Sequence, residues 1–229
     1  QDLLALHLLL SCYDIIYDLN LRIIMTEIWD KVYSKDSAFF GEEPSSFSRI
    51  CYIDFKKHHV KKLLELGCGQ GRDTLFFASH ELDIYAIDSS KVAIESLKQK
   101  IRKEKISIKL RQFDAKQGIP FGNKYFDAVY SHMFYNMRFT DVELRFLFWE
   151  SSRVLKNNGL LFFSVRSDKD VLYNKGQKVD NNIYEINGFQ MRFFTKEQIK
   201  SFLVNHFEIK NIEGYEVPVS LYLVLCYKK

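Results

Sequence analysis

The chain has 229 residues, which is enough for one α/β domain with a sizeable core. Hydrophobic residues make up 47% and charged residues 27%, as is ordinary for a soluble globular protein. The formal net charge of +4 is too small to indicate nucleic-acid binding by itself. The four cysteines have no metal-ligand spacing, so we expect no metal site and reduced thiols in a cytoplasmic protein: Cys12, Cys51, Cys68 and Cys226.

An apolar stretch, Leu3 to Leu10, lies near the start of the sequence. It has no basic leader or small-residue cleavage site and is too short to span a membrane, so we expect neither a signal peptide nor a membrane anchor. We predict an amphipathic helix over residues 3–24. This helix could pack on a sheet, cover a binding site or mediate an oligomer contact, and Met25 could be an alternative start.

Strand-like and helix-like segments alternate along the rest of the chain. We predict strands at about residues 62–66, 83–87, 106–111, 126–130, 160–165, 207–215 and 219–227. We predict helices over about 25–34, from Ser45 or Ser46, over about 72–80 and 89–103, from Thr140 or Asp141 to Leu155, and from Thr195 to about Asn205. Asn157-Asn158-Gly159 is expected to end the helix before it. A small hairpin is expected at 184–189, with Asn187-Gly188 at its turn. This alternation favours a mostly parallel sheet with helices on both faces.

The most informative segment joins the first of these strands to its helix. The strand runs into three glycines at alternate positions, Gly67, Gly69 and Gly71. A dinucleotide fingerprint would have its third glycine one residue later and a diphosphate on the helix N-terminus. Glu65 precedes the turn, and a carboxylate there would repel a diphosphate but suits a cationic ligand.

Acidic residues also follow the second and third strands. Asp88, followed by Ser89, ends the second strand at the position that binds ribose hydroxyls in such folds. Asp114, followed by Ala115, comes after the third strand. Alternatively, these acids cap helices or lie solvated at the ends of loops.

With these residues the chain resembles the class I S-adenosylmethionine-dependent methyltransferases. The family's motif Glu-x-Gly-x-Gly-x-Gly matches Glu65 and the three glycines, its ribose-binding acid matches Asp88, and its adenine-side acid matches Asp114. The resemblance covers residues 60–165 well and the tail more loosely. It implies a Rossmann-like seven-stranded sheet, mostly parallel with the last strand antiparallel, and a cofactor site formed by Glu65, Gly67, Cys68, Gly69, Gly71, Asp88, Ser89, Asp114, Ala115 and Ser131.

The chemistry of S-adenosylmethionine agrees with this resemblance. The cofactor has a ribose, an adenine, an amino-acid tail and a cationic sulfonium but no phosphate, so acidic residues suit it. Cys68 fills space inside the turn, and no base stands beside it in sequence to make it a nucleophile.

A second, shorter resemblance precedes the sheet. Trp29-Asp30-x-x-Tyr33 and Phe40-Gly41-x-x-Pro44-Ser45 resemble the lid region of small-molecule methyltransferases of the tellurite-resistance and thiopurine branches. We therefore expect residues 1–59 to provide N-terminal helices and a cofactor lid and 60–229 to form the methyltransferase core, within one compact domain. Tyr33 either places its ring near the sulfonium, which cation–π attraction favours, or packs in the core.

The methyl acceptor should lie beyond the fourth strand, which leads into Ser131 and His132. His132 could be a base or could orient the acceptor, and Tyr135 could help to align it; a packed or solvated histidine is the competing interpretation. Arg166 and Arg192 could bind an anionic acceptor or be solvated. The double proline of base-amino methyltransferases and the Pro-Cys of cytosine-C5 enzymes are both absent.

These features favour methyl transfer from S-adenosylmethionine, which yields S-adenosylhomocysteine, to a small-molecule or metalloid acceptor. The alternative on the same fold is a tRNA or rRNA methyltransferase, suggested by the basic run Lys56–Lys62 and a second basic run near Lys103. A nicotinamide-dependent oxidoreductase, disfavoured by Glu65 and Arg72, and a non-catalytic binding module are further hypotheses. We expect a monomer or homodimer with no stable nucleic-acid complex and no membrane association.

Overall fold

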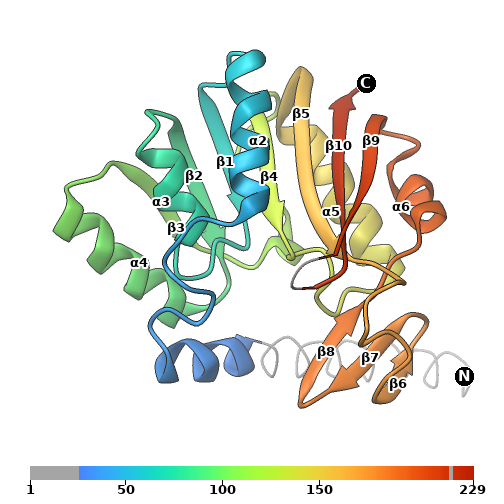
Figure 1. Ribbon diagram of the computed structural model, residues 1–229. Coiled ribbons are helices and arrows are strands. Elements are labelled where there is room, and N and C mark those ends of the chain that lie inside the picture. Colours follow the sequence, from blue (N-terminus) through green and yellow to red (C-terminus); the bar gives the residue numbers. More distant parts are fainter. Residues whose placement is uncertain (1–25, 217–218) are drawn as a thin grey trace, which may run out of the picture.

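A seven-stranded sheet forms the centre of the computed structural model, which describes residues 26–216 and 219–229 (Figure 1). The strand order is β3-β2-β1-β4-β5-β10-β9. The first five strands run parallel, and β10 lies antiparallel between β5 and β9. The predicted mostly parallel sheet is confirmed. Its strands are β1 (Lys62–Leu66), β2 (Asp83–Asp88), β3 (Ile108–Gln112), β4 (Phe126–His132), β5 (Leu155–Arg166), β9 (Phe207–Tyr215) and β10 (Leu221–Lys228).

Helices cover both faces of this sheet, as the alternation predicts. On one face, α2, α3 and α4 contribute Phe55, Phe77 and Leu97 to a fully buried apolar cluster. On the other, α5 and α6 contribute Phe148 and Leu203 to a second cluster. The helices are α2 (Ser46–Lys57), α3 (Arg72–Ala78), α4 (Lys91–Glu104), α5 (Asp141–Val154) and α6 (Lys196–Leu203), and residues 26–35 are also helical.

Side-chain caps start α2, α5 and α6 where the sequence predicts them. Ser45 accepts a hydrogen bond from the backbone of Ser48 at the start of α2. Thr140 and Thr195 each form a reciprocal capping box with the residue three positions later. The helix predicted over 3–24 lies outside the described residues.

One predicted helix end is wrong. Helix α5 ends at Val154 and β5 begins at once, so Asn157-Asn158-Gly159 lies in the strand and does not cap the helix. The carbonyls of Arg153 and Val154 already accept hydrogen bonds from the backbone of Lys124 and Tyr125. Because this distant segment satisfies the helix end, no glycine cap is required there.

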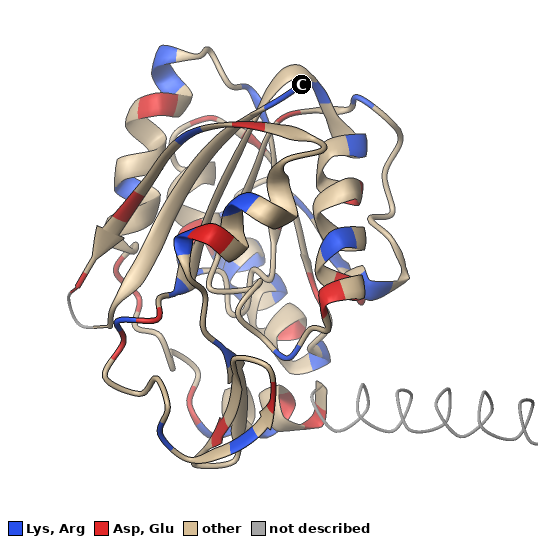
Figure 2. Cartoon of the chain, turned by 90° about the vertical axis from the view of Figure 1, so that its right-hand side faces the viewer, with Lys and Arg blue, Asp and Glu red and all other residues tan. Residues whose placement is uncertain are grey.

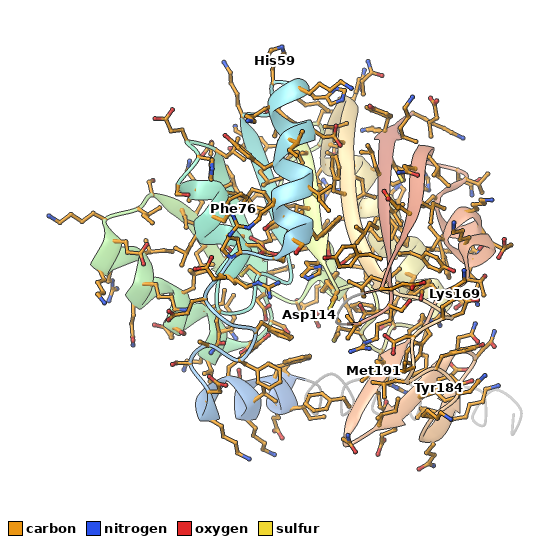
Figure 3. All side chains as sticks on the ribbon, in the orientation of Figure 1. His59, Phe76, Asp114, Lys169, Tyr184 and Met191 are labelled. Atoms are coloured by element: carbon orange, nitrogen blue, oxygen red, sulfur yellow. The ribbon has the colours of Figure 1, made fainter. Side chains whose placement is uncertain are left out.

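A second, three-stranded sheet follows β5, formed by β6 (Gln177–Asp180), β7 (Ile183–Ile186) and β8 (Phe189–Arg192). Its β7–β8 hairpin turns at Asn187 and Gly188, both with positive φ, which confirms the predicted Asn-Gly turn. In Figures 1 and 3 this sheet and helix 26–35 lie beneath the lower edge of the main sheet, where the parallel strands end. Two separate segments thus border one edge of the sheet, the edge at which ligands bind in open α/β folds.

Among the helices formed by residues 26–216 and 219–229, none has the length and apolar character needed to cross a membrane.

Candidate functional site

A cavity with two adjoining lobes lies at the carboxyl edge of β1, β2 and β4. The first lobe has a volume of about 300 Å³ and is lined by Asp88, Ser89, Asp114 and Ala115. The second has a volume of about 540 Å³ and is lined by Glu65 and the glycine turn. The lobes share Tyr33, Phe39, Phe40, Gly67, His132, Met133 and Arg166. Most of the sequence-predicted site residues are therefore brought together around one cavity.

The glycine turn needs its glycines for two different reasons. A Cβ on Gly67 would lie 2.9 Å from Phe134 Cβ, and one on Gly69 would lie 3.0 Å from the Tyr33 hydroxyl, so these positions allow close approach at the cavity. Gly71 lines neither lobe. It is the N-cap of α3 at φ +87, and a Cβ there would lie 2.2 Å from Leu97 Cδ1. Gly71 thus supports the turn through helix packing.

Asp88 links the turn to the first lobe. Its Oδ2 accepts a hydrogen bond from the backbone N–H of Gly69 at 2.9 Å, and its Oδ1 accepts one from Ser90 at 2.8 Å. Burial raises the pKa of this carboxyl. The remaining lone pairs are available to hydroxyl groups in the lobe.

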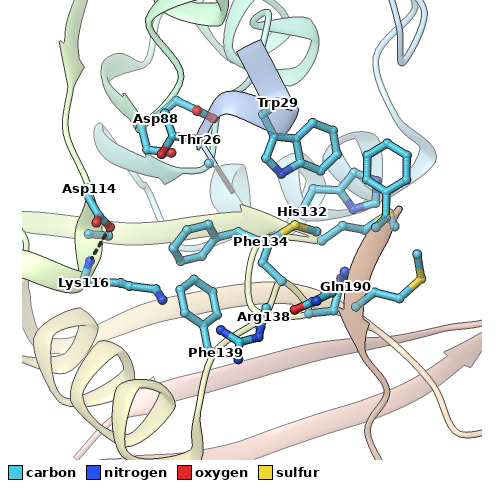
Figure 4. A pocket seen from close by; sticks show the side chains of 18 of the residues that line it. Thr26, Trp29, Asp88, Asp114, Lys116, His132, Phe134, Arg138, Phe139 and Gln190 are labelled. Atoms are coloured by element: carbon cyan, nitrogen blue, oxygen red, sulfur yellow. Dashed lines mark hydrogen bonds between the residues drawn. The ribbon is translucent and has the colours of Figure 1, made fainter. Parts of the chain in front are cut away.

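Asp114 lies on the same lobe, and Figure 4 shows both carboxyl groups on its left side. Its Oδ1 accepts a hydrogen bond from Lys116 N at 3.0 Å and caps a short 3-10 helix, Ala115–Gln117. The capping role considered from the sequence is therefore present, and it fixes the carboxyl group at the cavity wall.

Glu65 is 3% exposed and accepts a hydrogen bond from the Thr74 hydroxyl at 2.6 Å. Burial, reinforced by the negative charge of Asp73, raises its pKa to about 8. Near neutral pH the group is therefore largely protonated, and a cation in the second lobe would favour its ionised form.

This linkage gives a measurable prediction. Binding of cationic S-adenosylmethionine at pH 7.5 should lower the Glu65 pKa and release roughly half a proton or more from this group. Calorimetric titrations in buffers of different ionisation enthalpy measure the protons released. The Glu65→Gln variant is the control, because the difference between the two proteins isolates this carboxyl from the ligand's own amine. Equal proton release by both proteins would contradict the prediction.

Polar side chains fasten the segment before α2 to the glycine turn. Gln70 Nε2 donates to the carbonyl of Asp36 at 2.7 Å, and Gln70 Oε1 accepts from Phe39 N at 3.1 Å. Arg72 donates to the carbonyl of Phe40 at 2.9 Å. Asp30 accepts hydrogen bonds from Ser90 Oγ at 2.5 Å and from the backbone N–H of Val92 at 3.2 Å, at the start of α4. Sequence reasoning missed these contacts because they join residues far apart in the chain. The one available signal was Gln70, a polar residue between the motif glycines Gly69 and Gly71.

Aromatic rings from this segment line the cavity. Tyr33 is 8% exposed and stacks on Trp29 with ring centroids 5.4 Å apart. Trp29 also contacts Phe189 of the small sheet, at 5.7 Å. Tyr33 is therefore packed, as one interpretation expected, and it also lines both lobes; its placement near a sulfonium stays a prediction.

His132 lies where the two lobes meet, with its Nδ1 2.6 Å from Ser164 Oγ. The buried Ser164 hydroxyl also accepts from Met133 N at 3.1 Å, and within the described residues His132 is the acceptor left for its proton. This contact favours the tautomer with the ring proton on Nε2, in which the imidazole is a hydrogen-bond donor toward the cavity. Burial lowers its pKa to about 4, which opposes protonation.

We therefore expect His132 to orient a ligand without removing its proton. Its neutral ring should persist from pH 9 to about pH 5, and nitrogen-15 NMR of the imidazole should report the Nε2–H form throughout. Since the unfolded ring protonates near its ordinary pKa of 6.5, this group lowers stability as pH falls from 6.5 to about 4. An imidazolium signal of His132 in the folded protein at pH 6.5 would contradict this assignment. The His132→Gln variant is the control, because it removes the imidazole signal and keeps a hydrogen-bond donor.

Besides Gly71, two predicted residues lie outside the lining of the cavity. Tyr135 is fully buried, stacks on Phe148 at 4.5 Å and has its hydroxyl 2.7 Å from Ser151 Oγ. The expectation that it aligns the acceptor is therefore corrected to core packing. Ser131 is also fully buried and lines neither lobe, because neighbouring side chains alternate across β4 and His132 takes the cavity side.

The donor set fits a phosphate-free nucleoside carrying a positive charge. Three carboxyl groups, those of Glu65, Asp88 and Asp114, line the cavity around the glycine turn. Arg72 beside the turn is already engaged by Asp73 at 3.3 Å and by the Phe40 carbonyl. A diphosphate would be repelled by ionised carboxyl groups at this wall and would not favour ionisation of Glu65, whereas ribose hydroxyls, an adenine amino group and a sulfonium suit these acidic residues.

Comparisons with known proteins agree with this chemistry. Residues 63–159 match the family model of a methyltransferase domain. No curated protein matches the chain in sequence. The fold is similar to that of a Burkholderia thailandensis 1,6-didemethyltoxoflavin-N1-methyltransferase solved with its substrate and S-adenosylhomocysteine: the TM-score is 0.72 at 14% identity, over 92% of this chain and 89% of that one.

Two further structures share the fold. A S-adenosylmethionine-dependent methyltransferase from Clostridium acetobutylicum has a TM-score of 0.68 at 16% identity, over 89% of this chain and 97% of that one. TehB from Haemophilus influenzae has a TM-score of 0.60 at 17% identity, over 79% of this chain and 62% of that one. The comparisons therefore show that residues 63–159 form a methyltransferase domain and that the chain has the fold of S-adenosylmethionine-dependent methyltransferases.

Proposed function

We propose that this enzyme transfers a methyl group from S-adenosylmethionine to a small-molecule acceptor. The observation that carries the proposal is the lining of the cavity, in which aromatic and methionine side chains continue beyond the cofactor-side carboxyl groups: Trp29, Phe39, Phe40, Phe189 and Met191. A cavity of this size and lining suits an organic molecule better than a nucleic-acid strand.

When bound, S-adenosylmethionine supplies an electrophilic methyl group, and its sulfur keeps the electron pair of the broken bond. The residues of the chain then have to hold the cofactor and align the acceptor with the methyl group. Asp88 and Asp114 bind the nucleoside, and Tyr33 presents an aromatic ring toward the positive charge. His132 donates a hydrogen bond that orients the acceptor, and an acceptor proton leaves to water. We also propose that six further residues lining the cavity contribute to cofactor binding: Glu65, Gly67, Cys68, Gly69, Ser89 and Ala115.

The wider organisation follows from this function. We propose that residues up to 59 act as the lid and that 60–229 form the core, in a cytoplasmic monomer or homodimer. The buried free thiols of Cys51, Cys68 and Cys226 support a reducing compartment. The charge distribution supports the absence of a stable nucleic-acid complex. Lys, Arg, Asp and Glu are interspersed on the side shown in Figure 2, and His59 of the basic run lies at the opposite end of the sheet from Asp114 in Figure 3.

An acceptor screen tests the proposal. Purified enzyme and S-adenosylmethionine are incubated separately with thiols, amines, phenols, halides, tellurite, selenite and transfer RNA, and S-adenosylhomocysteine formation is measured. We expect turnover with a small molecule and none with RNA. Turnover with RNA alone, accompanied by a salt-dependent gel shift, would contradict the proposal and favour the nucleic-acid alternative.

A further inference from the structure

We propose that Asn136, Arg138 and Gln190 form an acceptor subsite for a planar aromatic acceptor, in which Arg138 and the Asn136 amide group bind a carboxylate or similar anionic group and Gln190 Oε1 accepts a hydrogen bond from a donor group of the same molecule. This inference rests on the proposed small-molecule methyl transfer and names the acceptor's chemical class. All three residues line the first lobe. In Figure 4 the labelled side chains of Arg138 and Gln190 lie below Trp29 and Phe134, across the pocket from Asp88 and Asp114.

Buried polar atoms at this wall have no hydrogen-bond partner within the described residues. Asn136 is 1% exposed, yet neither its Nδ2 nor its Oδ1 is paired. The same holds for Gln190 Oε1 and Arg138 Nε, whereas Gln190 Nε2 is held by Glu185 Oε2 at 2.8 Å. Because an unpaired buried polar group costs free energy, a cluster of them facing a cavity indicates a polar ligand.

The wall is held in place by the backbone. The carbonyl of Asn136 accepts a hydrogen bond from Arg192 N at 2.7 Å, and Met137 pairs with Met191 in an isolated bridge. The loop after β4 is thereby joined to β8 of the small sheet. This connection positions Asn136 and Gln190, which are 54 residues apart in sequence, on one surface before any ligand binds.

The charge balance of the lobe favours an anion at this wall. Lys116 pairs with Glu143 at 2.7 Å, and Arg166 pairs with Asp170 at 2.8 Å. Within the described residues, Arg138 is in no such ion pair. The lobe's own acids, Asp88 and Asp114, lie on the cofactor side (Figure 4). The Arg138 guanidinium and the Asn136 Nδ2 group are donors that suit a carboxylate, whereas Gln190 Oε1 can only accept and suits a hydroxyl or amino group of the ligand.

The surrounding walls favour a flat ring behind that anion. Phe134 and Phe139 contact each other at 5.1 Å on one side, and Trp29 and Phe189 contact each other at 5.7 Å on another. All four line the lobe. Aromatic side chains stack on planar ligands, and a bare oxyanion such as selenite would leave these faces uncovered.

Paired fragments test the subsite without knowledge of the true acceptor. Each pair shares a nucleophile and differs in the carboxylate: 4-hydroxybenzoate and phenol, 2-mercaptobenzoate and thiophenol, 2-aminobenzoate and aniline. Ligand-observed NMR measures their affinities with and without S-adenosylhomocysteine, and selenite is measured alongside. We expect each carboxylate to bind at least about ten-fold tighter than its partner, and selenite to bind weakly.

Variants assign that preference to the guanidinium. Arg138→Gln should remove the preference and Arg138→Lys should keep part of it, while the affinity for S-adenosylhomocysteine stays within about two-fold. The exposed Arg102 on α4 provides the matched control, and Arg102→Gln should change nothing. Equal affinities within the pairs, a preference that survives Arg138→Gln, or tight binding of selenite would overturn the inference. Failure to bind S-adenosylhomocysteine would instead count against the proposed function. The fragment affinities measured without S-adenosylhomocysteine would still test the subsite.

Discussion

Replacing Asp88 with alanine should weaken the binding of S-adenosylmethionine by at least about 100-fold, since charge-assisted hydrogen bonds contribute about 1.5–3 kcal/mol each. The substitution removes the acceptor for ribose hydroxyls. It also removes the acceptor of the Gly69 and Ser90 backbone N–H groups, so the glycine turn loses its link to the end of β2. Both losses act on the same ligand-binding surface. Calorimetric titration of the variant measures the effect directly.

Asp83 provides a matched control on the same strand. It begins β2 at the opposite end from Asp88, and its carboxylate pairs with Lys109 at the surface. Asp83→Ala should therefore leave the dissociation constant unchanged. Asp88→Asn, which keeps one acceptor oxygen, should fall between the wild type and the alanine variant. Unchanged affinity in a folded Asp88→Ala protein would remove this residue from the site.

Replacing Gly71 with alanine should lower the free energy of unfolding by about 3 kcal/mol. A Cβ there would lie 2.2 Å from Leu97 Cδ1 and 2.9 Å from its Cγ, so α3 and α4 would have to move apart. The φ of +87 adds backbone strain for any residue with a side chain. Urea denaturation measures the loss.

Gly122→Ala is the matched control, because nothing lies within 4 Å of its added Cβ and its φ is not positive. Its unfolding free energy should stay within about 0.5 kcal/mol of the wild type. An equally small effect at Gly71 would contradict the packing role assigned to that glycine.

Local chemistry made much of this fold predictable. The caps at Ser45, Thr140 and Thr195 were predictable because each capping bond forms with a residue three positions away. The glycine turn and Asp88 were predictable because both belong to one strand–turn–helix–strand unit.

Long-range contacts were not predictable in this way. Gln70 acts on the backbone of residues 36 and 39, and the end of α5 is satisfied by residues 124 and 125. Tyr135 follows a strand that ends at the cavity, but the chain turns there and Phe148 of α5 covers its ring. No local pattern carries these tertiary partners. The subsite at Asn136 was likewise unpredictable from the sequence. It depends on the small sheet, and no pattern in the sequence indicated the first strand of that sheet, β6.

The central claim is that the cavity beside Gly69 binds a cationic nucleoside without phosphate. Calorimetric titration of the wild-type protein with S-adenosylmethionine, S-adenosylhomocysteine and a reduced nicotinamide dinucleotide tests it most directly. We predict saturable one-to-one binding of the first two, with dissociation constants on the order of micromolar, and no heat from the dinucleotide. Tight binding of the dinucleotide, with no heat from the other two ligands, would contradict the account.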